Sequence, residues 1–400
     1  MLTNLVAAEF TPKADIDKRI AGLKAGMEAE GIAFAVILQN ADFFYFSGTM
    51  QKGVMIVPLE GEPLLFIEKS VDRARVESPF NLIPIKKDKE IRNILAEKGA
   101  LKGKGGMELD VIPVAVFERY KGLLGVESFT DISPIIKELR IVKSPFEIDQ
   151  VKRSGEIVSR VFEKARHVIS EGVREIDIDA DLVAEGRRYG HHGFLRMRGL
   201  NQEMMNLYVT TGVSATIHSA GDVPISGVGV SAAIPQGSSI KTVERGVPVN
   251  VDYGGGYNGY ITDETRPFVA GELREEFRRP YEVAREIVEE TAQFGKEGVN
   301  ATELFDRAYT RAKNAGLEEG FMGHGAGKVG FIGHGLGLEI NELPVITPRH
   351  KRVLKEGMVF AFEPKFILPG KGAIGIEVDF IVRKDRFERV IDFPIDIVYV

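Results

Sequence analysis

Short apolar runs alternate with amphipathic helical patterns over the first part of the chain. The runs Ala33–Leu38, Gly53–Pro58 and Pro63–Glu68 predict strands, and Val71–Glu77 and Lys87–Lys98 predict helices, the second bounded by Gly99. This alternation is typical of an α/β domain, which we place at residues 1–140. We expect the basic, glycine-rich segment Lys102–Gly106 to be a solvated loop.

A strong helix start marks a second domain beyond Arg140. Ser144 is suited to cap a helix, Pro145 to occupy its first position and Glu147 to close a capping box. The pattern that follows predicts two helices (144–169 and 176–189), strands between 193 and 269, two more helices (274–294 and 302–315), and strands again. We therefore expect residues 141–400 to form an α+β domain with two similar halves, each of two helices followed by strands.

Carboxylates within apolar strands are the clearest chemical signal. Asp252 ends one apolar run, Asn258-Gly259 predicts a tight turn, and Asp263 lies on the returning strand, so a hairpin can bring both carboxylates to one face. A second apolar pair of runs carries Glu363 and Glu377 on either side of a glycine-rich turn.

Four buried carboxylates without counter-charges would cost more than a domain's net stability. Arg or Lys partners are one way to neutralise them, and two divalent cations are another. Oxygen ligands suit hard to borderline metals such as Mn, Co, Fe or Zn, so the four residues predict a metal site.

Composition and charge exclude several other classes of protein. The 400 residues include no cysteine, which excludes thiolate nucleophiles and zinc–thiolate or iron–sulfur sites. A net charge of −6 lacks the basic excess of nucleic-acid or polybasic membrane binders. Because neither a secretory signal nor a long apolar span stands out, we expect a cytoplasmic protein without a nucleic-acid or membrane partner.

Several motifs resemble those of the pita-bread metallopeptidases, the family of methionine aminopeptidase, aminopeptidase P, prolidase and creatinase. The segment 333–339 (GHGLGLE) with Glu342 and Pro344 resembles the family signature. The surroundings of Glu363 and Glu377, the pair Asp252 and Asp263 with Arg266, the linker 137–147, and the segment 42–48 (DFFYFSG) fit its other blocks. The resemblance covers nearly the whole chain. It implies a creatinase-type amino-terminal α/β domain and a pita-bread catalytic domain with two pseudo-symmetric ααβ halves.

The resemblance also implies a dinuclear metal centre. Asp252 would chelate one ion, Asp263 and Glu377 would bridge both, and His334 and Glu363 would complete the other; it selects His334 over His324. Two such ions, with Mn or Co expected first and Fe or Zn as alternatives, can activate a shared water. Glu363 would then be the proton shuttle and, with His334, a catalytic residue.

The chain departs from the family at residues that meet the substrate. Gln236 and Asn341 stand where the family has histidines; we assign them the catalytic positions, where they can donate hydrogen bonds but not titrate near neutrality. Lys365 replaces a glycine and Gly375 replaces an arginine that often meets the substrate's carboxylate. Lys365 would either supply the lost positive charge or be a solvated surface lysine.

Three further residues are candidates for substrate binding. Arg196 and Arg198 alternate in strand fashion where the family builds its pocket wall, so they would face one side and could bind an anionic group; paired surface arginines are the alternative. His324, in a glycine-rich loop, would lie near the pocket without binding metal.

These observations predict a metal-dependent hydrolase, first a peptidase that cleaves the Xaa-Pro bond of dipeptides or short peptides. The alternative is a hydrolase or lyase of a small non-peptide molecule, as creatinase and ectoine hydrolase are, and the missing histidines favour it. A non-enzymatic interaction protein is the third hypothesis. The resemblance also implies a homodimer formed through the amino-terminal domain.

Overall fold

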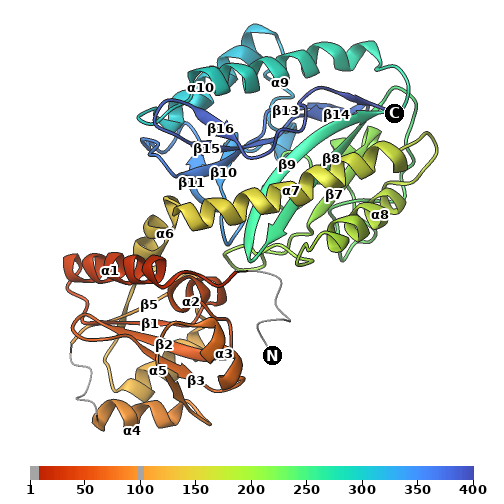
Figure 1. The fold of residues 1–400 in the computed structure, drawn as a ribbon. Coiled ribbons are helices and arrows are strands. Elements are labelled where there is room, and N and C mark those ends of the chain that lie inside the picture. Colours follow the sequence, from red (N-terminus) through yellow and green to blue (C-terminus); the bar gives the residue numbers. More distant parts are fainter. Residues whose placement is uncertain (1–8, 98–102) are drawn as a thin grey trace. The chain divides into compact units, whose positions relative to one another are not determined.

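The computed structural model describes residues 9–97 and 103–400, which form two compact units (Figure 1). The first unit comprises the chain up to Arg140 together with Arg198–Gln202. The second comprises Ile141–Met197 and Glu203–Val400. The chain therefore contributes one short segment, 198–202, to the first unit from within the sequence of the second.

The first unit is a mixed six-stranded sheet with helices connecting its strands. In sheet order the strands are β4 (Leu82–Pro84), β3 (Leu64–Ile67), β2 (Gly53–Pro58), β1 (Phe34–Ile37), β5 (Gly105–Met107) and β6 (Phe129–Asp131). The helices are α1 (Lys13–Ala29), α2 (Asn40–Ser47), α3 (Val71–Glu77), α4 (Lys89–Glu97), α5 (Val114–Leu124) and α6 (Ser133–Ile141). The three predicted strands and the two predicted helices of this region are confirmed as β1 to β3, α3 and α4, while Gly99 lies outside the described residues.

The expected loop at Lys102–Gly106 is wrong for its last two residues, because Gly105 and Gly106 begin β5 in the interior of the sheet. Lys102 lies outside the described residues. A Cβ atom at Gly105 would come within 2.8 Å of the Phe34 and Phe129 rings. Glycine is needed here because large side chains of the neighbouring strands fill the space, and not because the chain turns.

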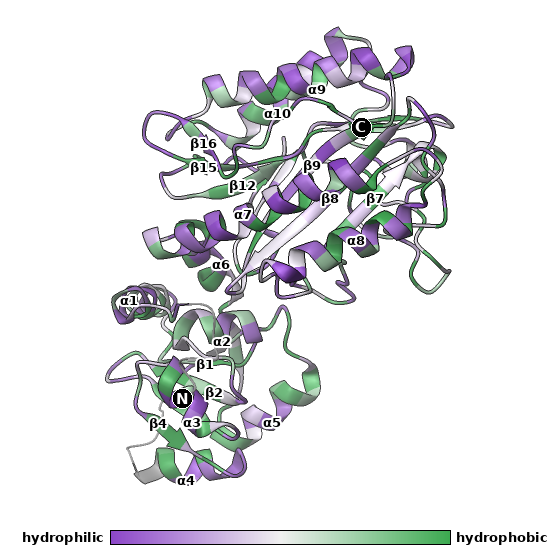
Figure 2. Ribbon diagram, turned by 45° about the vertical axis from the view of Figure 1, so that its right-hand side comes forward, coloured by the Kyte–Doolittle hydropathy of each residue, from purple (hydrophilic) through white to green (hydrophobic). Residues whose placement is uncertain are grey.

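The second unit begins with the predicted capping box. Ser144 Oγ accepts a hydrogen bond from the Glu147 amide at 3.2 Å, and the Ser144 amide donates to Glu147 Oε2 at 3.0 Å. The helix that follows, α7 (Pro145–Val168), alternates apolar and polar residues along its length (Figure 2). Its buried face includes Val158 and Phe162.

Two helix-and-strand halves make up this unit, as the sequence predicts. The first half contains α7, α8 (Glu175–Arg188), β7 (Leu207–Thr211), the 3₁₀ turn η2 (Gly212–Thr216), β8 (Pro248–Tyr257) and β9 (Tyr260–Val269). The second contains α9 (Glu275–Phe294), α10 (Ala301–Asn314), the 3₁₀ turn η3 (Gly325–Gly327), β10 (Gly333–Gly335), β11 (Glu342–Ile346), β12 (Val359–Phe362), β13 (Lys365–Leu368), β14 (Gly372–Gly375), β15 (Val378–Val382) and β16 (Phe387–Arg389); β17 (Val398–Tyr399) returns to pair with β9. The strand orders are β17-β9-β8-β7, β11-β10-β12-β15-β16 and β13-β14. Each half has its own apolar core beneath its pair of helices.

Both predicted hairpins form, and they differ in regularity. Asn258 and Gly259, at φ 50° and 86°, make the two-residue turn between β8 and β9. The second hairpin is interrupted: β12 pairs with β15 and β13 pairs with β14, leaving Glu363 and Glu377 outside regular pairing at the two breaks. The breaks place two carboxylates where the backbone changes direction.

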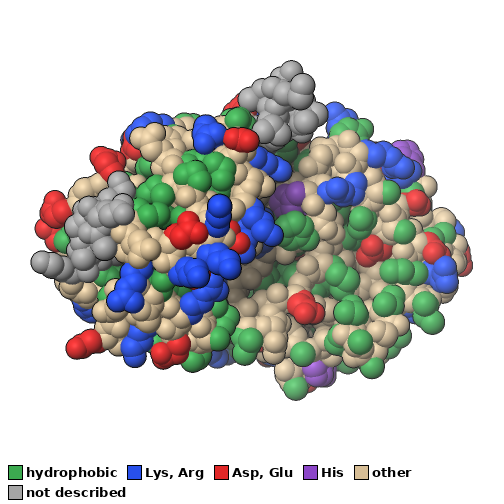
Figure 3. Space-filling view, turned by 90° about the horizontal axis from the view of Figure 1, so that it is seen from below, with side chains coloured by type: hydrophobic (Ala, Val, Ile, Leu, Met, Phe, Trp, Pro, Cys, Tyr) green, Lys and Arg blue, Asp and Glu red, His purple; other side chains and the backbone are tan. Residues whose placement is uncertain are grey.

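The surface carries mixed charge. On the face that Figure 3 shows, acidic side chains lie among basic ones on both parts of the molecule, in keeping with the modest net charge of −6. In the described part of the chain, no helix combines the length and apolar character needed to cross a membrane.

Candidate metal centre

Asp252 and Asp263 come together through the register of the β8–β9 hairpin. Asp252 pairs with Thr265, and Asp263 lies two residues before Thr265 on the same strand. Because side chains two residues apart on a strand share a face, the two carboxylates are diagonal neighbours on one side of the hairpin. The expectation that they share a face is therefore confirmed.

The second half of the unit brings the other carboxylates and the histidine to the same place. Glu377 forms an isolated backbone bridge with Thr265, and the Thr265 hydroxyl donates to Glu377 Oε2 at 2.7 Å. His334 lies in β10. This strand pairs with β12, and Glu363 directly follows the last residue of β12. All four carboxylates are buried or nearly so, with Glu363 and Glu377 3% and 1% exposed.

Asp263, His334 and Glu377 are arranged so that they could hold one metal ion. One ligand atom from each lies within 4.8 Å of the others, and His334 Nε2 is 3.7 Å from Asp263 Oδ2. Two carboxylates and an imidazole form a nitrogen–oxygen donor set that suits Mn, Co, Fe or Zn. The residues therefore fit a divalent ion.

Lys365 is the unexpected member of the site. Its ammonium group lies 3.0 Å from Asp252 Oδ2, 3.0 Å from Glu363 Oε2 and 2.7 Å from Glu377 Oε2. The residue is 2% exposed, so the alternative of a solvated surface lysine is wrong. Its assignment as a substrate-binding residue stays a prediction, and its ammonium group pairs with three of the predicted metal ligands.

The electrostatics follow from burial of like charges. Burial raises the pKa of Asp263 well above its ordinary value, and the Glu377 and Asp252 carboxylates add to the rise. Burial also raises the pKa of Asp252, although the nearby Lys365 opposes the shift. Burial would lower the pKa of Lys365, but the surrounding carboxylates outweigh it and raise that pKa well above its ordinary value. A cation is strongly favoured at this place.

A second layer of buried charge, which the sequence patterns did not predict, supports the cluster. Asp379 Oδ2 accepts from the Asp263 amide at 2.8 Å, and Glu264 Oε1 accepts from the Asp379 amide at 3.1 Å. Arg266 pairs with Glu264 at 2.8 Å and donates to the Glu377 carbonyl at 2.6 Å. Burial raises the pKa of Asp379 well above its ordinary value, with Glu264 adding to the rise. The signal that could have found Asp379 is the one used for the ligands, an acidic residue between Val378 and Phe380 in an apolar strand.

The two residues that replace family histidines are at least partly accessible. Gln236 is half-buried, and its Nε2 donates to the Glu203 carbonyl at 2.8 Å. Asn341 is exposed and directly precedes β11. Their catalytic assignment stays a prediction.

The expectation for the two arginines is wrong in part. Residues 193–203 form no strand, so Arg196 and Arg198 are not held in strand alternation. Arg198 is buried and donates to Asp110 through Nε and Nη2, at 2.8 and 2.9 Å, and to Asp42 through Nη1 at 2.8 Å. All three guanidinium nitrogens thus donate to carboxylates of the first unit, which disfavours binding of an anionic substrate by Arg198. The Arg196 guanidinium lies over the Phe194 ring, 5.2 Å from its centre, and its substrate role stays a prediction.

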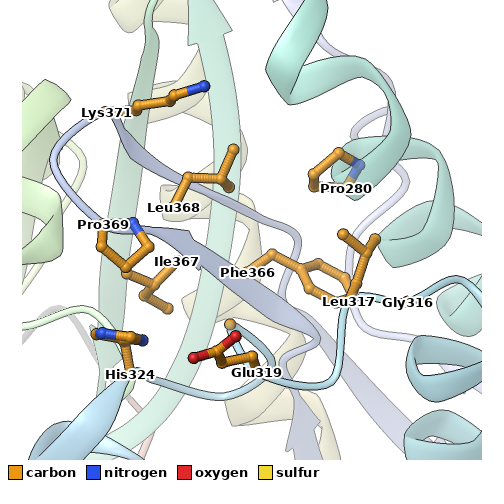
Figure 4. Close-up of a pocket in the computed structure, with 11 residues that line it drawn as sticks. Pro280, Gly316, Leu317, Glu319, His324, Phe366, Ile367, Leu368, Pro369 and Lys371 are labelled. Carbon is orange, nitrogen blue, oxygen red and sulfur yellow. The ribbon is translucent and has the colours of Figure 1, made fainter.

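His324 lies beside a cavity that the predicted metal ligands do not line. This cavity of about 340 Å³ is lined by residues that include His324, Glu319, Leu317 and Phe366, and by none of the five predicted ligands (Figure 4). His324 Nδ1 is buried and has no hydrogen-bond partner within the described part of the chain. Its substrate-binding role stays a prediction.

Carboxylates and an imidazole that converge between two similar halves of helices and strands define the site of a metallohydrolase. Residues 149–384 match the model of metallopeptidase family M24, and residues 19–142 match the creatinase/prolidase N-terminal domain. Because the first match spans more than half of the chain, the protein belongs to metallopeptidase family M24.

Characterised relatives and solved structures are similar over nearly the full length. The Xaa-Pro dipeptidase of Pyrococcus furiosus is 29% identical, with 93% of this chain and 97% of the relative covered. The crystal structure of X-Pro aminopeptidase from Thermotoga maritima superposes with a TM-score of 0.78 at 26% identity, covering 95% of this chain and 99% of that one. The prolidase from Pyrococcus furiosus gives a TM-score of 0.76 at 27% identity, covering 92% and 98%.

Proposed function

We propose that the protein is a metal-dependent peptidase that cleaves the Xaa-Pro bond of dipeptides or short peptides. The convergence of Asp263, His334 and Glu377 on one buried position carries the proposal. The names of the similar proteins, Xaa-Pro dipeptidase and X-Pro aminopeptidase, support the choice of substrate.

Asp263, His334 and Glu377 would hold the divalent ion, with Mn²⁺ or Co²⁺ expected and Fe or Zn as alternatives. When bound, the ion supplies Lewis-acid polarisation of the scissile carbonyl and lowers the pKa of the attacking water. Glu363 would accept the water's proton and return it to the leaving amine. The Glu363 carboxylate is held in place by the Lys365 ammonium at 3.0 Å.

Gln236 and Asn341 would contribute hydrogen bonds to the substrate. Neither side chain can carry a proton near neutral pH, so proton transfer would rest on Glu363 alone. We therefore expect weaker dependence of turnover on histidine titration than in a site with both family histidines.

The first experiment compares two substrates on apo protein reloaded with Mn²⁺ or Co²⁺. Hydrolysis of a Met-Pro dipeptide alone would support a dipeptidase, and hydrolysis of a longer Xaa-Pro peptide as well would support an aminopeptidase. Asp263→Asn provides the matched control, because it removes one ligand charge and should abolish metal binding and hydrolysis. Failure of the wild-type protein to cleave either substrate, with metal demonstrably bound, would contradict the proposal.

A second candidate is hydrolysis of a small non-peptide molecule by the same site. It is favoured by Gln236 and Asn341, which replace the two residues through which the peptidases assist their tetrahedral intermediate. This candidate would be supported if the metal-bound protein cleaved neither peptide but released ammonia or a carboxylic acid from small amides.

Location and assembly are parts of the proposal that rest on the sequence. The cytoplasmic location follows from the expectation made on the sequence, and the resemblance to prolidases implies a homodimer formed through the amino-terminal domain. Sedimentation of the purified full-length chain would test the dimer directly.

A further inference from the structure

Lys365 binds the same carboxylates that the family pattern assigns to metal. Its ammonium group contacts Asp252, Glu363 and Glu377, all at 2.7–3.0 Å. These distances are those of charge-assisted hydrogen bonds. Of the five expected ligands, only Asp263 and His334 have no contact with the Lys365 ammonium.

The division of the ligands leaves two different cation positions. Glu377 Oε2 is used by both Lys365 and the Thr265 hydroxyl, at 2.7 Å each. Glu377 nevertheless still belongs to the trio with Asp263 and His334 whose ligand atoms lie within 4.8 Å. One side of the site therefore holds the lysine ammonium, and the other side keeps three groups that could hold a metal ion.

A second divalent ion would have to share its ligands with the lysine. Total charge does not decide the number of ions: the four carboxylates carry −4, so one divalent ion with Lys365 leaves −1 and two divalent ions with Lys365 leave +1. The contacts do decide it. A divalent ion bound by Asp252 and Glu377 would lie against an ammonium group that contacts the same two carboxylates, and the two cations would repel each other.

The strand opposite Lys365 leaves space for its side chain. Lys365 pairs with Gly375 across β13 and β14, and a Cβ atom at Gly375 would lie 2.4 Å from Lys365 Cγ. The family pattern has glycine at the position of Lys365 and arginine at the position of Gly375. The large and the small residue have thus exchanged places, which is the change expected if the lysine side chain must pass over this position to reach the carboxylates.

We propose that the Lys365 ammonium permanently replaces one of the two metal ions of the family's centre, so that this protein binds a single divalent ion through Asp263, His334 and Glu377. The inference rests on the metal dependence in the proposed function but not on the identity of the substrate. Because the measurement is the number of bound ions, a failure of this inference can be distinguished from a failure of peptide cleavage.

The test counts ions in the full-length protein. Wild-type protein, Lys365→Gly and the exchanged pair Lys365→Gly/Gly375→Arg are equilibrated with Mn²⁺, freed of excess metal and analysed for manganese per chain. Electron paramagnetic resonance gives a second readout, because a single Mn²⁺ and a coupled Mn²⁺ pair have different spectra. Lys384→Met, at an exposed lysine of the same unit, is the matched control.

We expect one ion per wild-type chain and two ions per chain in both glycine variants, with the signal of a coupled pair. Two ions in the wild-type protein would overturn the inference, and so would none. A single ion in a folded Lys365→Gly would also overturn it, because the second position would then be lost for another reason.

Asp252→Asn keeps the inference testable if the glycine variants fail to fold. Because Asp252 contacts the lysine and lies outside the metal-binding trio, its neutralisation should leave the single ion bound, with its affinity changed less than tenfold. Asp263→Asn should remove the ion. Loss of the ion in Asp252→Asn would contradict the proposed division of the ligands.

Discussion

Gly375 lies directly opposite Lys365 across the β13–β14 pair, with room for the lysine side chain only because position 375 carries no Cβ atom. The glycine is not needed for its backbone conformation, since Gly375 is absent from the glycines with positive φ. Its function is spatial. It lets a long side chain cross the strand pair and reach the carboxylates from within the sheet.

Gly375→Ala should therefore destabilise the protein by about 1–3 kcal/mol, the usual cost of overpacking a filled interior. Lys365→Gly in the same chain should recover part of this loss, because the nearest clashing atom, Cγ of Lys365, is removed. Urea denaturation of the two single variants and the double variant measures this coupling.

Gly122→Ala is the control for this prediction. Gly122 is an exposed glycine of α5 with no atom within 4 Å of the added Cβ, so the substitution should be neutral or stabilising. Strictly additive effects of Gly375→Ala and Lys365→Gly would refute the spatial explanation.

Thr265 orients the Glu377 carboxylate. Thr265→Val removes the hydroxyl that donates to Glu377 Oε2, and metal affinity should fall about 10- to 100-fold, as for other residues that hold a metal ligand in place. Thr265→Ser keeps the hydroxyl and should retain near wild-type affinity. Calorimetric titration of both variants with Mn²⁺ decides the matter, and equal affinities would show that the hydroxyl is dispensable.

Gln236 limits peptide cleavage in our proposal, because it cannot carry a proton where the family has histidine. Gln236→His should raise kcat for an Xaa-Pro dipeptide, and the increase should follow deprotonation of the new imidazole between about pH 6 and 7. Gln236→Asn is the matched control and should give no gain. Unchanged turnover in the histidine variant across this pH range would show that position 236 is not limiting.

Sequence patterns predicted the frame of the site well. The Asn258-Gly259 turn fixes the β8–β9 register, and that register alone places Asp252 and Asp263 on one face. The place of Lys365 in the site could not be predicted in this way. It depends on the breaks at Glu363 and Glu377, because β13 and β14 pair between them and Lys365, the first residue of β13, lies at the carboxylate cluster. A break in a hairpin has no periodic signature, so the sequence showed that Lys365 was unusual but not where its ammonium group lies.

The prediction that Arg198 lies in a strand was wrong for a related reason. Alternation suggested a strand, but the segment is irregular, and Asp42 and Asp110, which bind the guanidinium, lie more than 80 residues away in the sequence. Long-range ion pairs leave no mark in local spacing. Asp379 differs: an acidic residue in an apolar strand marks it in the sequence, but its contact with the distant Asp263 amide does not.

Acid should destabilise the protein through His191. This imidazole is buried, accepts from the Gly193 amide at Nδ1 (2.9 Å) and lies with Nε2 3.1 Å from the Gly254 carbonyl. Burial lowers the pKa of His191 from 6.5 to about 4. The folded protein therefore holds a neutral imidazole while the unfolded chain takes up a proton below pH 6.5, so the stabilising contribution is present above pH 6.5 and is lost as the pH falls to 4.

The loss attributable to His191 is about 3 kcal/mol over this range. His191→Gln, which can keep both hydrogen bonds but cannot titrate, should show a correspondingly flatter dependence of unfolding free energy on pH. Guanidine denaturation between pH 7 and pH 4.5 measures the two slopes, and exposed His350→Gln serves as the control. Parallel curves for wild type and His191→Gln would contradict the assignment.

Arg198 should contribute to stability and not to substrate binding. Arg198→Ala leaves the Asp42 and Asp110 carboxylates with one fewer partner each, at a cost of about 3 kcal/mol in the first unit. KM should be unchanged at temperatures where the variant is folded. Arg188→Ala, which breaks an exposed pair with Glu185, should cost less than about 1 kcal/mol. A raised KM without a loss of stability would restore the substrate-binding hypothesis.

The segment 198–202 has a consequence for how the two units can be exchanged between proteins. The chain passes from one unit to the other after Arg140, after Met197 and after Gln202, so the units are joined by three covalent connections. A fragment cut after residue 140 would keep Asp42 and Asp110 but lose Arg198, and the remaining fragment would carry that arginine without its carboxylates. Recombination at a single junction would therefore take the paired charges from different parents, and a chimera that preserves these ion pairs as they are here would carry the first 140 residues and the segment 198–202 from the same parent.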